Sequence, residues 1–255
     1  MTDTHTHIYD VKAFPEGPDK VLSRAREAGV DRFILPNVNV ESAPQLIALH
    51  KASPHCTYVA AGLHPCDASE NWREEIESIM NTFAVCKPVA IGEVGMDLYW
   101  DKSTLERQKE VFAAQIEIAK RRGLPLIIHC REALYETLEV LRKHGDDVPA
   151  VFHSFTGNAA DVEAIRELGD YYFGINGVVT FKNAPELREA LAHIGKERIL
   201  LETDSPYLAP VPYRGRRNES AYIQSVAEEV AKCLGMEKAE IEEITDNNVS
   251  EFFGI

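Results

Sequence analysis

The sequence predicts an α/β fold, specifically a (β/α)8 TIM barrel formed by one domain that spans residues 1–255. Three observations predict it: eight short apolar runs rich in β-forming residues, helical periodicity between them, and polar side chains where the runs end. With 45% hydrophobic and 27% charged residues, the composition is typical of a globular protein and excludes disordered, collagen-like and coiled-coil chains. No long linker or low-complexity tract divides the chain.

The apolar runs supply the expected strands. They end roughly 23 to 36 residues apart, which leaves room for a strand, a helix and two short loops in each unit. The runs cover residues 1–5, 32–36, 57–63, 88–92, 124–128, 149–152, 171–175 and 198–201. Eight strands favour a closed barrel, although an open doubly wound sheet is the alternative because closure is not visible in a sequence. No Walker A or GxGxxG element follows the first run, which counts against a nucleotide-binding open sheet.

The segments between the runs carry the periodicity of amphipathic helices. Residues 105–119 place their apolar side chains on one face and their charged side chains elsewhere. Residues 21–28 repeat the pattern and stop before Gly29, a residue typical of helix C-termini. Helices therefore alternate with the expected strands.

Charge and cysteine content restrict the class of protein. The chain has 27 basic and 41 acidic residues and a formal charge of −14, which argues against a protein that coats duplex DNA by neutralising phosphates. A nuclease whose positive charge comes from bound metal ions is still compatible with this charge. Five cysteines without a CxxC pair, no signal peptide and no long apolar run indicate a cytoplasmic protein without a membrane partner. No obligate protein partner is evident either.

Histidines gather at the ends of the expected strands, where the catalytic groups of barrel enzymes lie. Five of the nine histidines occupy such positions: His5, His7, His64, His129 and His153. His5 and His7 are two residues apart, so both rings point to the same side of an extended strand. Each histidine alone has an ordinary explanation as a core or surface residue.

Two carboxylates occupy further strand ends. Glu93 has no lysine or arginine near it in sequence, and a buried carboxylate needs either a cationic partner or a metal. Asp204 stands before Ser205 and Pro206, where the alternative role is a turn cap. Four histidines and two carboxylates together are what two adjacent divalent ions require, with one carboxylate as the bridge.

Several motifs occur in a fixed order along the whole chain. They are Asp3-Thr-His-Thr-His7, Gly62-Leu-His-Pro65, Ile91-Gly-Glu-Val-Gly-Met-Asp97, His129-Cys-Arg-Glu-Ala133, His153-Ser-Phe-Thr-Gly157 and Leu200-Leu-Glu-Thr-Asp-Ser-Pro-Tyr-Leu-Ala-Pro210. With these motifs the chain resembles the TatD family of metal-dependent deoxyribonucleases, which belongs to the amidohydrolase-like barrels.

The resemblance implies a site residue by residue. One metal ion is implied on His5, His7, Glu93 and Asp204, and a second on Glu93, His129 and His153. His64, Arg131 and Glu202 are implied to line the site as substrate-binding or supporting groups. For Arg131 the alternative is a salt bridge to Glu132 or Glu136.

The resemblance also implies an activity. The implied activity is that of a 3′-5′ exodeoxyribonuclease, which hydrolyses phosphodiester bonds of single-stranded DNA. A metal-activated water would be the nucleophile, and Asp204 the general base. Because relatives also act on misacylated tRNA, a metal-dependent ester or amide hydrolase such as a tRNA deacylase is the alternative, and RNA or tRNA are further substrate candidates. Four imidazoles favour zinc, manganese or nickel, while the resemblance implies magnesium.

A basic cluster near the C-terminal third is a candidate nucleic-acid contact. Arg214, Arg216 and Arg217 lie close in sequence, and aromatic residues follow several strand ends. These aromatic residues are Tyr99, Trp100, Phe181, Tyr207 and Tyr213. Arginines beside aromatic rings can hold a single strand. The alternative is a solvated loop with the aromatic rings packed beneath it.

Overall fold

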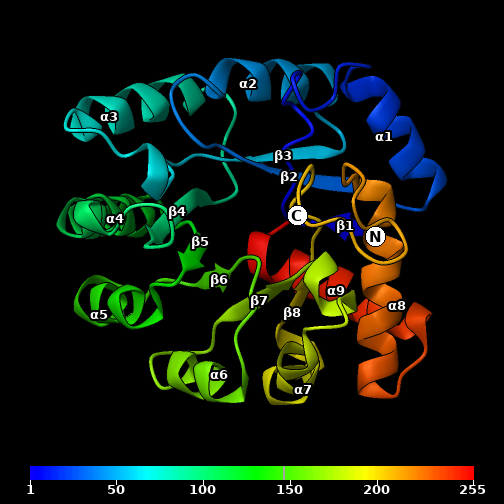
Figure 1. Ribbon diagram of the computed structural model, residues 1–255. Coiled ribbons are helices and arrows are strands. Elements are labelled where there is room, and N and C mark those ends of the chain that lie inside the picture. The colour runs from blue at the N-terminus through cyan, green and yellow to red at the C-terminus, as the bar shows by residue number, and fades with distance from the viewer. Residues whose placement is uncertain (146) are drawn as a thin grey trace.

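Eight parallel strands alternate with helices around a central barrel in the computed structural model, which describes residues 1–145 and 147–255 (Figure 1). The strands are β1 (Thr2–Asp3), β2 (Arg32–Pro36), β3 (Thr57–Ala60), β4 (Ile91–Asp97), β5 (Leu126–Arg131), β6 (Ala150–Phe152), β7 (Tyr172–Ile175) and β8 (Ile199–Leu201). The outer helices are α1 (Pro18–Glu27), α2 (Ala43–Ala52), α3 (Trp72–Phe83), α4 (Leu105–Arg122), α5 (Leu134–His144), α6 (Ala159–Arg166), α7 (Pro185–Ile194) and α8 (Ile223–Leu234). The predicted (β/α)8 barrel is thereby confirmed.

Backbone hydrogen bonds close the barrel at two seams. Continuous parallel pairing joins β1 to β3 and, separately, β4 to β8. Between β3 and β4, the amide of Ala61 donates to the carbonyl of Ala90 at 3.1 Å. Between β8 and β1, the amide of Thr4 donates to the carbonyl of Leu201 at 3.1 Å. The open sheet is therefore not the fold of this chain.

Strand β4 differs most from its expected limits. The apolar run ends at Gly92, whereas the strand continues to Asp97 with every residue buried. Gly95 makes this continuation possible, because a Cβ atom there would lie only 2.1 Å from the carbonyl oxygen of His129 on β5. Glu93 consequently lies within the strand, and Asp97 takes the tip where a polar side chain can enter the barrel mouth.

The strands separate two hydrophobic layers. Side chains such as Leu35 and Ile128 point outward and pack beneath the helices, whereas their neighbours Ile34 and Ile127 point inward and fill the barrel. This alternation is the two-residue period of a strand. The interior is therefore a packed core and not a channel.

A ninth helix, α9 (Lys238–Phe253), closes the barrel at the N-terminal ends of the strands. Its Phe253 joins the interior cluster, and its Asn248 donates hydrogen bonds of 2.8 Å to the carbonyls of Lys196 and Ile199 where β8 begins. In Figure 1, α9 is the red helix seen in the middle of the ring of strands. The C-terminal strand ends therefore form the open mouth. No helix in residues 1–145 and 147–255 is long and apolar enough to cross a membrane.

Candidate metal centre

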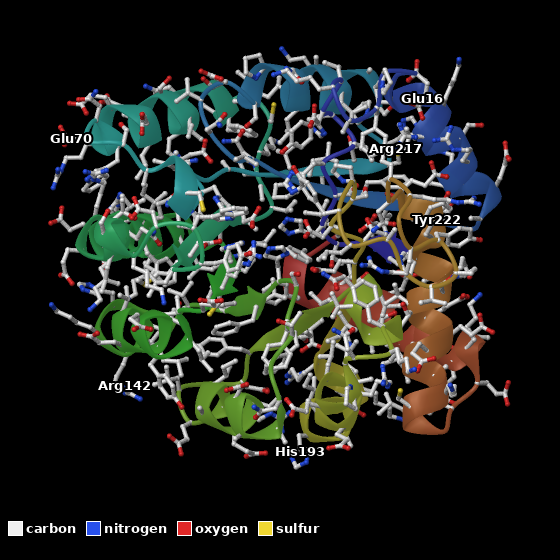
Figure 2. All side chains as sticks on the ribbon, viewed as in Figure 1. Glu16, Glu70, Arg142, His193, Arg217 and Tyr222 are labelled. Carbon is white, nitrogen blue, oxygen red and sulfur yellow. The ribbon has the colours of Figure 1, made fainter. Side chains whose placement is uncertain are left out.

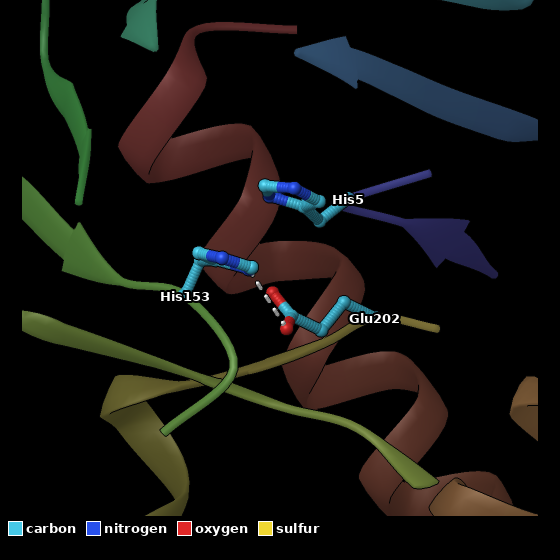
Figure 3. A group of neighbouring side chains, drawn as sticks. All are labelled: His5, His153 and Glu202. Atoms are coloured by element: carbon cyan, nitrogen blue, oxygen red, sulfur yellow. Dashed lines mark ion pairs between the residues drawn. The ribbon is translucent and has the colours of Figure 1, made fainter. Parts of the chain in front are cut away.

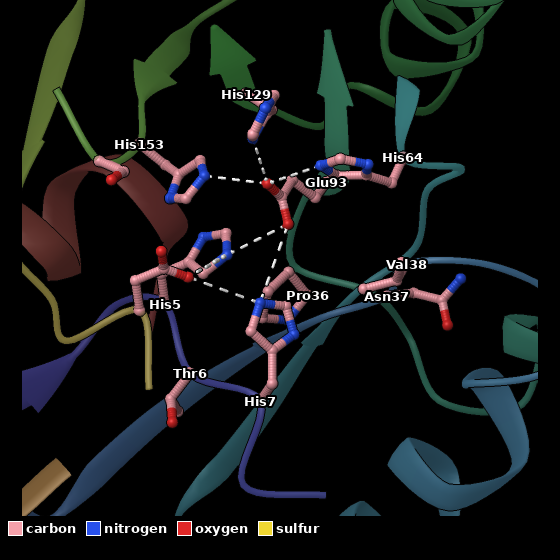
Figure 4. A network of polar contacts seen from close by, with 12 residues as sticks. His5, Thr6, His7, Pro36, Asn37, Val38, His64, Glu93, His129 and His153 are labelled. Atoms are coloured by element: carbon pink, nitrogen blue, oxygen red, sulfur yellow. Dashed lines mark hydrogen bonds and ion pairs between the residues drawn. The ribbon is translucent and has the colours of Figure 1, made fainter. Parts of the chain in front are cut away.

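All six predicted ligands meet at the open mouth of the barrel. Figure 4 labels five of them: His5, His7, Glu93, His129 and His153. The six come from five strands or the residues directly after them: His5 and His7 follow β1, Glu93 lies in β4, His129 in β5, His153 after β6, and Asp204 after β8. Glu93 is 4% exposed and His5 is fully buried. Residues separated by as many as 199 positions in the chain thus share one polar site within an apolar wall.

Glu93 lies at the centre of this site. Its Oε2 atom is 3.3 Å from Nε2 of His5 and 3.9 Å from Nε2 of His7. Its Oε1 atom is 2.8 Å from Nδ1 of His129 and 2.9 Å from Nε2 of His153. Each carboxylate oxygen therefore faces a different pair of histidines, which is the arrangement expected of a bridging ligand.

Asp204 completes the side of the site that contains His5 and His7. Its Oδ1 atom lies 3.9 Å from Nε2 of His5 and 3.7 Å from Nε2 of His7. Asp204 adopts a φ of 54°, a left-handed conformation that aspartate tolerates better than most residues. Burial raises the pKa of the Asp204 carboxyl to about 7, with His153 opposing the shift and Glu93 adding to it. A pKa near neutrality suits a group that exchanges protons during catalysis.

Tyr9 fixes the tautomer of His7. The Tyr9 hydroxyl donates to the carbonyl of Pro36 at 2.6 Å, so its oxygen accepts a hydrogen bond from Nδ1 of His7 at 2.8 Å. The hydrogen is then on Nδ1, and the lone pair of Nε2 faces the carboxylates. Burial lowers the pKa of His7 to about 4, which keeps the ring neutral. Tyr9 is missing from the sequence prediction, although its position two residues after His7 is a usable signal.

Asp97 fixes the tautomer of His129, as Tyr9 does for His7, and is also missing from the sequence prediction. Its Oδ2 atom is 2.9 Å from Nε2 of His129, on the opposite side of the ring from Glu93. Burial alone would raise the pKa of Asp97, but the hydrogen bond with His129 lowers it to about 2. A proton on Nε2 of His129 leaves Nδ1 free to bind a metal. The alternation of Glu93, Gly95 and Asp97 along one strand face could have indicated this role.

Glu202 lies behind His153 and orients its ring (Figure 3). Its Oε1 atom is 3.4 Å from Nδ1 of His153 and accepts a 2.7 Å hydrogen bond from the amide of Ser154. Gly174 leaves room for this carboxylate, because a Cβ atom there would lie 2.2 Å from Oε2 of Glu202. The ring of His5 stacks on His153 with centroids 3.7 Å apart. Glu202, predicted as a substrate-binding or supporting group, lies in the structure where it can hold His153 in position.

His64 reaches the site as a hydrogen-bond donor. Its Nε2 atom is 3.4 Å from Oε1 of Glu93. Its Nδ1 atom accepts a hydrogen bond from the amide of Cys66 at 3.2 Å, so the neutral ring carries its hydrogen on Nε2. A nitrogen that carries hydrogen has no lone pair for a metal. That His64 contacts the substrate stays a prediction.

Arg131 lies at the rim of the mouth. Its guanidinium carbon is 3.7 Å from the ring centre of Tyr99 and 5.5 Å from that of Trp100. Glu132, its suggested salt-bridge partner, instead faces Lys102 at 3.9 Å. The guanidinium therefore remains at the surface of the mouth, on an aromatic support.

The donor set fits a metal. Among the described residues, Nδ1 and Nε2 of His5 are buried without a hydrogen-bond partner. Buried polar atoms are seldom left in this state unless an ion or water satisfies them. Burial lowers the pKa of His5 well below its usual value, so its nitrogen lone pair is available. His5, His7 and Glu93 place three ligand atoms within 4.8 Å of one another.

The three arginines of the predicted basic cluster have different environments in the structure. Arg217 donates to Glu16 at 2.5 and 2.9 Å, and the two side chains lie together in Figure 2. Arg214 stacks on Phe181, with its guanidinium carbon 3.8 Å from the ring centre. Arg216 is exposed. The charge of Arg217 is thus matched by a carboxylate within the protein.

Comparisons with known proteins agree with this site. The family described as TatD related DNase matches residues 2–254. The metal-dependent hydrolase YabD of Bacillus subtilis is 36% identical over 256 residues and covers 100% of this chain and 99% of its own length. The 3′-5′ ssDNA/RNA exonuclease TatD of Edwardsiella piscicida is 35% identical and covers 92% of each chain.

Comparison with a solved structure shows that the fold is shared as well. The crystal structure of YJJV, a TatD homolog from Escherichia coli K12, superposes with a TM-score of 0.90 at 29% identity and covers 100% of this chain and 98% of that one. Sequence family, fold and a buried cluster of side chains that could hold a metal lead to the same conclusion: the chain belongs to the TatD family and is a metal-dependent hydrolase.

Proposed function

We propose that this hydrolase is a 3′-5′ exonuclease that removes nucleotides from single-stranded DNA and uses two divalent ions. The observation that supports two ions is the position of Glu93, whose two oxygens face separate pairs of histidines. The similarity to an enzyme named 3′-5′ ssDNA/RNA exonuclease supports the substrate. When bound, two such ions lower the pKa of a water and stabilise charge on both oxygens of a phosphodiester displacement.

Two sets of residues would hold the ions. His5, His7 and Asp204 would form one set, and His129 and His153 the other, with Glu93 shared between them. Nitrogen-rich ligand sets favour zinc, manganese or nickel in affinity, while magnesium is the ion expected from nuclease chemistry. Metal analysis of the purified protein would identify the ion.

Other residues would bind and orient the substrate. The Nε2–H group of His64 points into the site and would donate to a phosphate oxygen. The guanidinium of Arg131 at the rim would attract the backbone, since its geometry matches phosphate. Asp204, whose carboxylate lies beside His5 and His7 at the mouth, would accept the proton of the attacking water.

The test is an assay of single-stranded DNA labelled at its 5′ end. We expect a ladder of products shortened from the 3′ end, lost on addition of a chelator and restored by divalent ion. Misacylated tRNA is assayed in parallel. Metal-dependent release of amino acid from the tRNA, together with intact DNA, would replace the exonuclease by the deacylase. DNA cleavage that resists the chelator would contradict the metal-dependent mechanism.

A further inference from the structure

The most exposed aromatic side chains lie on the face that carries the metal centre. Four aromatic side chains within residues 1–145 and 147–255 are more than a third exposed: Tyr99 (48%), Trp100 (70%), Tyr135 (78%) and Tyr207 (60%). All four follow the C-terminal ends of strands β4, β5 or β8. An exposed tryptophan in particular is uncommon, because burial of its large apolar ring is strongly favourable. This distribution indicates a surface that binds flat ligands.

Tyr99, Trp100 and Arg131 form one unit, here named the Trp100 platform. The two rings meet edge to face, with centroids 4.9 Å apart and an angle of 86°. The guanidinium of Arg131 lies on Tyr99, which leaves the ring of Trp100 exposed to solvent. An aromatic ring beside a cation is the combination with which proteins stack a base and contact the adjacent phosphate.

Asp97 fixes the Trp100 platform relative to the metal centre. Its Oδ1 atom accepts hydrogen bonds from the amides of Tyr99 at 2.9 Å and Trp100 at 3.2 Å. Its Oδ2 atom contacts the ring of His129 at 2.9 Å. One carboxylate therefore positions both a metal-binding histidine and the backbone of the Trp100 platform, so a ligand stacked there has a defined position relative to the reacting phosphate.

We propose that the Trp100 platform stacks one base of a single-stranded nucleic acid while the backbone enters the metal centre. The proposal rests on the exonuclease function proposed above and specifies how the strand is held. A duplex does not fit, because the faces of its bases are covered by their neighbours. The net charge of −14 and the internal pairing of Arg217 with Glu16 leave little basic surface to hold phosphates, so stacking has to supply much of the affinity.

The first test replaces the ring of Trp100. Loss of one base-stacking contact is expected to raise KM for a single-stranded octanucleotide about 5- to 100-fold in Trp100→Ala, with kcat almost unchanged. Trp100→Phe should retain most of the wild-type KM because it keeps a flat ring. Val85→Ala is the matched control: Val85 is 73% exposed but precedes β4, away from the mouth. An octamer of abasic residues should bind wild type and Trp100→Ala equally weakly.

The second test measures binding without turnover. The chain has two tryptophans, and Trp72 is only 7% exposed, with the guanidinium of Arg73 4.0 Å from its ring centre. In Trp72→Phe with chelator present, oligothymidylate should quench the fluorescence of Trp100 to saturation, and the abasic octamer should not.

The outcomes separate the two proposals. DNA cleavage by wild type with an unchanged KM in Trp100→Ala and no quenching would overturn the Trp100 platform and leave the exonuclease intact. Saturable quenching without any DNA cleavage would support the platform and contradict the exonuclease. Equal loss of affinity in Trp100→Ala for the natural and abasic octamers would also overturn stacking, because that loss would not depend on a base.

Discussion

Glu93 and Asp204 are both buried carboxylates of the metal centre, but their surroundings give them different properties. Around Glu93, burial alone would raise the pKa, yet His153, His64, His5 and the hydrogen bond from His129 hold it well below its usual value. Asp204 has fewer cationic neighbours, and burial raises its pKa to about 7. Glu93 is therefore suited to remain a charged bridge, and Asp204 to move a proton.

Asparagine at position 204 tests this difference. Asp204→Asn keeps one carbonyl oxygen for a metal but cannot accept a proton. General-base catalysis contributes about 10²- to 10⁴-fold, so turnover should fall by at least that range. Glu93→Gln should instead weaken binding of both ions, and its activity should fall with metal occupancy. Kinetics over a metal titration should show partial rescue of Glu93→Gln and almost none of Asp204→Asn. Equal rescue would mean that the base lies elsewhere.

Metal binding should also depend on pH. The pKa of His153 is raised well above its usual value: burial opposes this shift, but Glu93 and Glu202 outweigh it. A proton on this ring must leave before a metal can bind there, so metal affinity should fall as pH drops through this raised pKa and should keep falling at lower pH. Calorimetry of metal binding in buffers of different ionisation enthalpy would count the protons released. Binding without proton release at pH 7 would contradict this account.

At the scale of elements, the loop after β8 connects the metal centre to the first helix. This loop includes Asp204 and Arg217, and the hydrogen bonds of Arg217 to Glu16 anchor it beside α1. The hydrogen bond from Arg217 lowers the pKa of Glu16 to about 2. Since this pKa is lower in the folded chain, the pair stabilises the fold above about pH 4.5, and the contribution is lost as pH falls toward 2.

Arg216 and Arg217 should consequently behave differently when replaced by alanine. Arg217→Ala should lower the free energy of unfolding at pH 7 by at most about 1 kcal/mol, because the pair is partly exposed, and the difference from wild type should shrink below pH 4.5. Arg216→Ala should leave stability unchanged and raise KM in a salt-dependent manner if the loop contacts phosphates. Thermal melts across pH and KM across salt concentration measure the two effects. A stability loss in Arg217→Ala that is as large at pH 3 as at pH 7 would exclude the Glu16 pair as its cause.

At the scale of the whole molecule, sequence patterns predict those features that depend on nearby residues and recur in each strand–helix unit. The strands and the gathering of the six proposed ligands could be predicted because a buried apolar run followed by a polar residue is visible in any one unit. The end of β4 could not be predicted, since this strand continues beyond the apolar run to Asp97 only because Gly95 admits the backbone of β5. The roles of Tyr9 and Glu202 depend on contacts with Pro36 and His153, which are distant in sequence.

Within residues 1–145 and 147–255, helix α9 leaves the barrel one entrance, because it covers one mouth while side chains such as Ile34 and Ile127 fill the interior. If the enzyme is the proposed exonuclease, its DNA strand would not be threaded through the barrel. Each released nucleotide would then leave through the opening by which the strand entered. We therefore expect a distributive enzyme: after mixing with labelled DNA, a large excess of unlabelled trap should stop shortening within one or a few nucleotides. Long runs of degradation past the trap would show that the strand stays bound between cuts.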